Sequence, residues 1–240
     1  RDLHSFPTRR SSDLENLAAD RNEYAEVMPY IFHFAPDGIS LCIKSIQGLD
    51  LNRFTAIYFT ILGKHDERYS ISLLLRLQFR KLGMNNAYVV VLDEPTANQA
   101  ETVYRTIKQE QIEGAIFVKD ADGYFKGDFT SGNSIAIYPL DRLDMVNPHN
   151  KSYVQVDDQF YITNIIEKKI ISRWFNAGGY IFEETSTFCY YYERLKAYSP
   201  LFMSHIVYSM LLDKISFRPM EVEEYQDWGT ENMLHLNTKI

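Results

Sequence analysis

Two carboxylates stand at the end of an apolar run, in the segment Phe117-Val-Lys-Asp-Ala-Asp-Gly-Tyr-Phe125. Asp120 and Asp122 lie where a buried strand of this kind would reach solvent. Hard cations such as Mg²⁺ are bound in proteins by one or two carboxylates together with the phosphates of a substrate. The pair therefore indicates a binding site for a metal ion and a phosphate group. A turn that either aspartate caps with its own side chain stays open as the structural alternative.

The neighbouring runs predict the elements that must position this pair. Segments rich in β-branched and aromatic residues predict strands at residues 54–62, 87–92 and 115–118, with amphipathic helices between them at 66–82 and 99–109. Strands and helices that alternate at this spacing predict a parallel sheet made of βαβ units. Ligands bind outside the carboxyl ends of such strands, so we expect segments 93–102 and 119–125 to meet there.

From about residue 130 the pattern changes to short strands joined by turns. Strands are expected at 134–140, 153–156, 161–167, 179–182 and 217–222, with helices near 184–197 and 201–213. This pattern favours a mixed second half packed on the first. We therefore expect residues 15–240 to form a single α/β domain of three layers (α/β/α), with a mixed, mainly parallel central sheet.

Several short segments resemble, in the same order, motifs of the sugar-1-phosphate nucleotidyltransferases, including the glucose-1-phosphate thymidylyltransferases. They are Thr96-Ala-Asn-Gln-Ala-Glu-Thr102 (with Asn98 where the family has glycine), the strand end around Asp122, Ile165-Ile-Glu-Lys168, Asn176-Ala-Gly-Gly-Tyr-Ile-Phe182 and Asp227-Trp-Gly-Thr230. Each motif is common by itself, whereas their joint order and spacing are specific. The resemblance implies a Rossmann-like (GT-A-like) fold, in which residues 15–130 form the nucleotide-binding half and 131–240 the sugar-binding half.

The resemblance also implies a reaction and its residues. A nucleoside triphosphate and a sugar 1-phosphate would give a nucleoside-diphosphate sugar, for surface (capsular) polysaccharide synthesis, and pyrophosphate. Asp122 and Asp227 would hold Mg²⁺, Asp122 and Lys168 would be catalytic, and Asp120 would support the metal ligands. The expected substrate-binding residues are Gln99 and Thr102 near the nucleotide, Lys168 at the sugar phosphate, and Glu167, Asn176 and Gly179 at the sugar.

The phosphate-binding loop of the family is altered in this chain. Aligned on Tyr24 and Pro29, Ala19 replaces a glycine, Glu23 an arginine and Tyr30 a lysine, while Arg21 lies nearby but offset. A carboxylate beside phosphates reverses the local electrostatics. A non-catalytic relative that binds a sugar nucleotide or a partner subunit therefore stays open beside the enzyme.

Two other families place a D-x-D motif at a strand end. Haloacid-dehalogenase-like phosphatases also need a G-D-x-x-x-D cluster, which this sequence lacks. Glycosyltransferases of the GT-A fold bind a metal and a nucleotide diphosphate through D-x-D, and they stay open. His65, in Lys64-His-Asp-Glu67, has the chemistry of a catalytic base, although a helix start with acidic residues explains the segment as well.

The first fourteen residues, RDLHSFPTRRSSDL, match the translation of a high-throughput sequencing adapter in order. We expect residues 1–14 to be an artefact outside the fold, with few core contacts, and the natural N-terminus to be missing.

The whole-chain composition limits the partners. A net charge of −7 without a basic stripe argues against nucleic acid. The sequence contains no apolar run long enough for a membrane span. Two cysteines far apart, Cys42 and Cys189, favour buried thiols over a metal site, so the cytoplasm is the default compartment. A homo-oligomer stays open.

Overall fold

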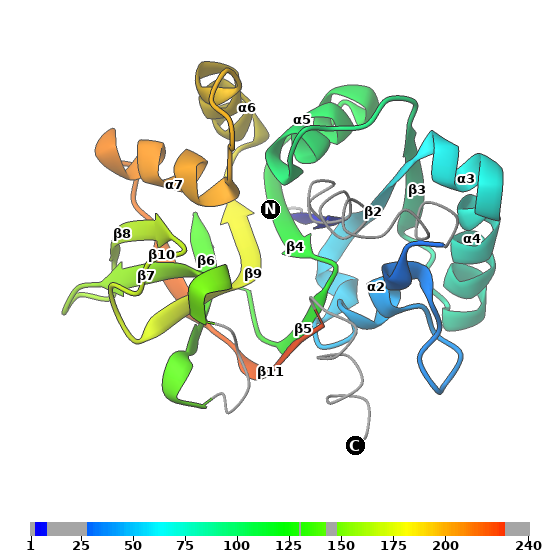
Figure 1. The fold of residues 1–240 in the computed structure, drawn as a ribbon, viewed down its shortest axis with the longest axis horizontal. Helices are drawn as coiled ribbons and strands as arrows, with labels where there is room; N and C mark the ends of the chain where they lie inside the picture. Colours follow the sequence, from blue (N-terminus) through cyan, green and yellow to red (C-terminus); the bar gives the residue numbers. More distant parts are fainter. Residues whose placement is uncertain (1–2, 9–27, 130, 143–147, 229–240) are drawn as a thin grey trace.

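The computed structural model describes residues 3–8, 28–129, 131–142 and 148–228, with only the backbone given for 3–8 (Figure 1). Its strands are β1 (Leu3–Thr8), β2 (Phe54–Leu62), β3 (Ala87–Leu92), β4 (Ala115–Asp120), β5 (Gly123–Lys126), β6 (Ser134–Pro139), β7 (Ser152–Val156), β8 (Ile162–Glu167), β9 (Trp174–Phe182), β10 (Arg218–Glu221) and β11 (Glu223–Asp227). The α-helices are α2 (Leu41–Lys44), α3 (Gly63–Tyr69), α4 (Ile71–Leu82), α5 (Gln99–Glu110), α6 (Thr185–Leu195) and α7 (Met203–Leu212). Short 3₁₀ turns are formed by Tyr30–Phe32, Leu51–Arg53, Leu140–Arg142 and Pro148–Asn150.

One nine-stranded sheet runs through both halves of the chain, in the order β10-β6-β9-β4-β1-β2-β3, and β7 and β8 extend it from β9. The strands β4, β1, β2 and β3 are parallel, as the βαβ pattern predicts. β9 then pairs antiparallel with β4, β6 and β7. The sheet is therefore mixed, parallel from β4 to β3 as expected and largely antiparallel beyond β4.

Alternate residues of β4 face two separate hydrophobic cores. Phe117 packs into the core that contains α2 and α4, whereas Ile116 and Val118 pack into the core that contains α5, α6 and α7. All three side chains are completely buried, as expected of a strand covered on both faces. Helices on both faces of one sheet give the predicted three-layer α/β/α arrangement, in which α5 lies above β4 in Figure 1.

The expectation that residues 1–14 lie outside the fold is wrong for the backbone of Leu3–Thr8. This segment forms β1, between β2 and β4 and parallel to both. The hydrogen bonds of a strand ladder join backbone groups, so a segment without a strand-like sequence pattern can still pair between β2 and β4. The side chains of this strand are outside the description, and the expected lack of core contacts stays a prediction.

The helix predicted at 66–82 divides into α3 and α4 at Ser70, whose φ is +53°. The Asp66 side chain accepts hydrogen bonds from the backbone amide of Ser72 (2.6 Å) and from its hydroxyl (2.5 Å), which stabilises the first turn of α4. The predicted end is confirmed, because Gly83 caps α4 in the left-handed conformation at φ +69°. Within the described residues, no helix is both long and apolar enough to span a membrane.

Candidate functional site

Asp122 and Asp227 lie on neighbouring segments, although they are far apart in the sequence. β5 and β11 form a two-stranded antiparallel sheet in which Asp227 pairs with Gly123. Immediately beyond this pair, the amide of Trp228 donates a hydrogen bond to the carbonyl oxygen of Asp122 at 2.8 Å. Two aspartates that only capped separate turns would have no reason to meet in this way. The structure therefore brings together the chain segments of the two predicted metal-binding residues.

A buried lysine holds the turn that carries the two strand-end aspartates. Lys119 is fully buried, and its Nζ donates to the carbonyl oxygens of Asp120 and Gly123, each at 2.8 Å. The ammonium also lies 4.5 Å from the centre of the Phe125 ring. Burial lowers the pKa of Lys119 to about 8, although Asp120 and Asp122 are near enough to raise it. This side chain thus joins the end of β4 to the start of β5 from the inside.

Asp227 is ion-paired with a lysine that lies far from it in the sequence. Lys151, just before β7, places its Nζ 2.6 Å from Oδ2 of Asp227, and each side chain is 16% exposed. The same Nζ donates to the hydroxyl of Tyr225 at 2.7 Å. Burial lowers the pKa of Lys151, but Tyr225 and Asp227 outweigh it and raise the pKa well above the ordinary value. Lys151 is therefore a permanently charged cation within the candidate site.

Asp120 faces α5 and β9. Its Oδ1 accepts a hydrogen bond from Nε2 of Gln99, the first residue of α5. On the other side Gly178 approaches so closely that an added Cβ would lie 2.6 Å from Oδ2 of Asp120. Gln99, predicted near the nucleotide, thus contacts Asp120 directly.

A cavity of about 100 Å³ opens at the carboxyl ends of β2 and β3. Its lining includes Thr96 and Thr102 from the loop and helix after β3, together with Ala121, which separates the two strand-end aspartates. The segments expected to meet at this edge of the sheet therefore do meet. His65 and Glu94 also line the cavity, and burial, reinforced by Lys64, lowers the pKa of His65.

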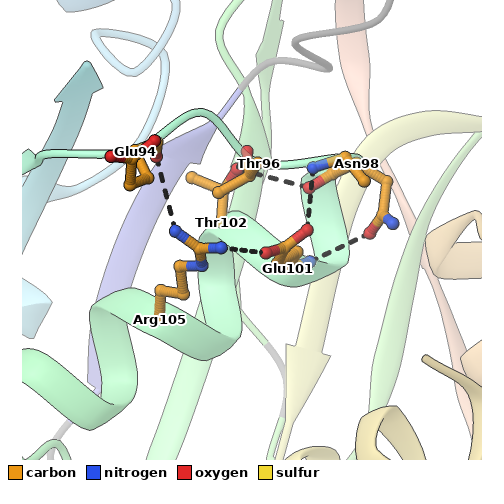
Figure 2. A network of polar contacts seen from close by, with 7 residues as sticks. Glu94, Thr96, Asn98, Glu101, Thr102 and Arg105 are labelled. Atoms are coloured by element: carbon orange, nitrogen blue, oxygen red, sulfur yellow. Dashed lines mark hydrogen bonds and ion pairs between the residues drawn. The ribbon is translucent and has the colours of Figure 1, made fainter.

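Residues of the 94–105 segment form one wall of this cavity, and a network of polar contacts holds the segment in place (Figure 2). The Thr96 and Thr102 hydroxyls lie 2.6 Å apart, and Asn98 caps α5 by accepting from the amide of Glu101 at 2.9 Å. Glu101 in turn accepts from the amide of Ala97 at 2.7 Å and pairs with Arg105 at 2.5 Å. Asn98, which stands where the family motif has glycine, thus acts as a helix cap that fixes the loop beside the cavity.

The predicted sugar-binding residues lie around β8 and β9. Glu167, at the end of β8, accepts a hydrogen bond at 2.7 Å from the hydroxyl of Ser204 on α7. Lys168 is exposed, has φ +57°, and its Nζ lies 5.1 Å from the centre of the Phe202 ring. The Lys168 amide donates to the carbonyl of Lys151 at 2.9 Å. This hydrogen bond places Glu167 and Lys168 beside Lys151, the residue whose side chain contacts Asp227.

Asn176 and Gly179 are buried within β9. The Asn176 side chain donates to the Tyr180 hydroxyl and to that of Ser152, at 3.4 Å for the latter, and accepts from the amide of Gly178 at 2.9 Å. A Cβ at Gly179 would lie 2.9 Å from that of Ala136 and within 3.1 Å of two core phenylalanine rings. Close packing alone thus requires the glycine at 179, and its predicted sugar contact stays a prediction.

Tyr30, which aligns with a lysine of the family, contacts Trp228, the residue that follows β11. Its hydroxyl donates to the carbonyl oxygen of Trp228 at 2.7 Å. The tyrosine therefore sits beside the junction of Asp122 and Trp228. Ala19, Arg21 and Glu23 of the aligned phosphate loop lie outside the described residues.

Comparisons with known proteins identify the fold. No protein-family model matches the sequence, and no curated protein sequence matches it significantly. Among solved structures, a nucleoside-diphosphate-sugar pyrophosphorylase from Vibrio cholerae superposes with a TM-score of 0.77 over 100% of both chains, at 16% identity. The chain has the fold of the sugar-phosphate nucleotidyltransferases.

Two further structures carry the same fold. A putative glucose-1-phosphate thymidylyltransferase from Bacillus anthracis, in complex with a sucrose, gives a TM-score of 0.69 at 14% identity, over 99% of this chain and 94% of that one. A UDP-glucose pyrophosphorylase complexed with UDP-glucose gives 0.70 at 10% identity, over 99% and 97%.

Sequence reasoning missed Lys151 and Lys119. Lys119 stands within the D-x-D segment, but attention fell on the aspartates beside it. Lys151 lies in no recognised motif, and a lysine between polar neighbours such as Asn150 and Ser152 is typical of an exposed surface. A lysine inside an otherwise apolar strand, as in Phe117-Val-Lys-Asp120, was a usable signal for Lys119, because such a residue is buried only with partners. For Lys151, whose partner Tyr225 lies 74 positions further along the chain, the sequence offered no signal.

Proposed function

We propose that this protein is a nucleotidyltransferase that joins a nucleoside monophosphate, from a nucleoside triphosphate, to a sugar 1-phosphate. The observation that supports it most is the hydrogen bond from Trp228 to Asp122, which holds the segments of Asp122 and Asp227 together beside Lys151. The cavity at Thr96, Thr102 and Ala121 adjoins this junction and would receive part of the nucleotide. The compartment would be the cytoplasm, and the product an activated sugar for surface polysaccharide.

In this reaction a phosphate oxygen of the sugar 1-phosphate attacks the α-phosphorus of the triphosphate. The bond from that phosphorus to the bridging oxygen of the β-phosphate breaks, and pyrophosphate leaves. Such a step depends on positioning and on positive charge near the attacked phosphate. The exposed Lys168 would bind the sugar phosphate, and Glu167, oriented by Ser204, would accept hydrogen bonds from sugar hydroxyls.

The resemblance implies Mg²⁺ held by Asp122 and Asp227. The arrangement of this chain does not fit a metal shared by both carboxylates, because Oδ2 of Asp227 is paired with the Lys151 ammonium at 2.6 Å. The mechanism proposed here is therefore built on the protein's own cations.

A second candidate is a relative that binds a sugar nucleotide without catalysing transfer. The hydrogen bond of Tyr30 to Trp228 favours it, because a neutral hydroxyl engaged with the backbone stands where the family motif has a phosphate-binding lysine. This form would keep the cavity and Lys168 but would not release pyrophosphate.

The experiment uses the full chain with a panel of nucleoside triphosphates and sugar 1-phosphates, with and without Mg²⁺. Pyrophosphate release and equilibrium binding are measured for the wild type, for Lys168→Met and for Lys169→Met, which removes the neighbouring exposed lysine. We expect release in the wild type and in Lys169→Met, and a loss of at least about 100-fold in Lys168→Met, because the cation at the sugar phosphate is removed. Binding without release in the wild type would select the second candidate. Neither binding nor release with any pair would refute both.

A further inference from the structure

The Lys151 ammonium is held in a site built for one positive charge. It contacts the carboxylate of Asp227 and the hydroxyl of Tyr225, and it lies 5.3 Å and 5.9 Å from the ring centres of Tyr225 and Phe175. Carboxylate, hydroxyl and the negative faces of aromatic rings all favour a cation. Because both charged side chains are only 16% exposed, solvent screens this pair weakly.

Backbone pairing with the end of β8 fixes the position of Lys151 and therefore of its ammonium group. The carbonyl of Lys151 accepts from the amide of Lys168, and Ser152 pairs with Glu167 where β7 and β8 meet. Asp227 is fixed from the other side by its pairing with Gly123 in β5. The ion pair therefore joins the sugar-binding half to the segment of Asp122, at the place where the family resemblance puts a metal ion.

We propose that the Lys151 ammonium replaces the divalent cation at Asp227, so that this chain binds nucleotide phosphates without a metal there. The nature of the anion rests on the proposed function, whereas the exclusion of metal stands on the ion pair alone. A divalent ion bound to Asp227 would meet the ammonium at contact distance, and like charges this close repel strongly in a poorly solvated site. Binding the metal would therefore require breaking the pair and moving a lysine whose side chain is only 16% exposed.

The test measures Mn²⁺ binding to the full chain, by electron paramagnetic resonance, without nucleotide. The variants are Lys151→Met, which removes the charge and keeps a chain of similar length, Lys151→Arg, which keeps the charge, and Lys151→Met combined with Asp227→Asn. We expect weak binding in the wild type and in Lys151→Arg. In Lys151→Met we expect binding at least about tenfold tighter, and in the double variant this gain should disappear. If Lys151→Met does not fold by circular dichroism, Lys151→Gln provides the same test.

Two results of the Mn²⁺ measurement would overturn the inference. One is a wild type that binds Mn²⁺ as tightly as Lys151→Met, and the other is a gain in Lys151→Met that survives Asp227→Asn. A second measurement follows nucleoside triphosphate binding in EDTA and in Mg²⁺, where equal affinity in the wild type is expected and strict dependence on Mg²⁺ would also overturn it. A wild type that binds no nucleotide in either buffer would refute the proposed function, while the Mn²⁺ measurement still decides whether Lys151 excludes the metal.

Discussion

Gly178 lies against the carboxyl group of Asp120, with no room between them for a side chain. A Cβ added to the glycine would come within 2.6 Å of Oδ2 and 2.9 Å of both Cβ and Cγ of Asp120. Gln99 holds Oδ1 of the same carboxylate from α5. The rotamer of Asp120 is therefore set between β9 and α5, which fixes the first residue of the turn that carries Asp122.

Gly178→Ala should destabilise the protein more than Gly114→Ala, which serves as a matched control. Both glycines have φ +82°, so alanine pays the same conformational cost of about 1 kcal/mol at each. At Gly114 an added Cβ would meet nothing within 4 Å, whereas at Gly178 it overlaps Asp120. We expect an additional loss of about 1–3 kcal/mol at Gly178, measured by urea unfolding. Equal losses in the two variants would contradict the close contact with Asp120.

Lys119 should make the stability rise with pH above about 8. Its pKa is lowered to about 8 in the folded protein, mainly by burial, from an ordinary value of 10.5. Between these two values the unfolded chain binds more protons than the folded one, so the free energy of unfolding increases with pH. Below about pH 8 the lysine is charged in both states, so the full cost of burying the charge lowers the free energy of unfolding.

The measurement compares the wild type with Lys119→Met in urea between pH 7 and pH 10.5. The difference between their free energies of unfolding isolates the lysine, because the tyrosines titrate in both proteins. We expect this difference to shift in favour of the wild type by roughly 3 kcal/mol across that range. A difference that does not change with pH would mean that Lys119 keeps its ordinary pKa.

Cys42 should resist thiol reagents in the native protein. It is 2% exposed and lines the cavity, and burial raises its pKa to about 12. Only the thiolate reacts, so labelling at neutral pH requires the protein to open. We expect slow labelling of the native chain, rapid labelling in urea, and a further slowing by any nucleotide that occupies the cavity. Cys189→Ser is the background in which a single thiol is followed, and fast labelling of Cys42 without denaturant would contradict its burial.

The strands at 54–62, 87–92 and 115–118 were predictable because each is an apolar run bounded by clear turns. Burial on both faces holds for 115–118, whereas Tyr88 of the edge strand β3 is 49% exposed. The order of the strands was less accessible, because antiparallel insertion of β9 beside β4 depends on contacts between residues more than fifty positions apart. The recruitment of Leu3–Thr8 as β1 could not be predicted from composition, since a ladder is formed by the backbone and not by the residue types.

The meeting of the motif segments at the candidate site was predictable from the sequence, because the resemblance placed those segments together. The D-x-D turn meets Asp227 and Trp228 because β5 and β11 pair. The resemblance implied that the two aspartates meet, although not the strand pairing that brings them together. The state of their side chains was not predictable. Whether Asp227 faces a metal or an ammonium depends on Lys151. The position of this lysine follows from the pairing of β7 with β8 and β9, and no local sequence pattern records that.

Tyr30 provides the last prediction, because it separates a structural role from a phosphate-binding one. Tyr30→Phe removes the hydrogen bond to the Trp228 carbonyl and should lower the free energy of unfolding by about 1 kcal/mol. Tyr30→Lys also removes that phenol but adds a cation beside the segments of Asp122 and Asp227. Combined with Glu23→Arg, it restores the charges of the aligned family motif.

Triphosphate binding is measured by isothermal titration. We expect the affinity to be unchanged in Tyr30→Phe and at least about tenfold higher in the Glu23→Arg, Tyr30→Lys double variant. The double variant adds two cations and removes one carboxylate near the expected position of the phosphates. High salt should reduce the gain, as expected of a charge effect at a partly exposed site. A double variant that binds triphosphate no better than Tyr30→Phe would mean that the aligned loop does not approach the phosphates, and the assignment of residues 18–30 to the phosphate loop would be wrong.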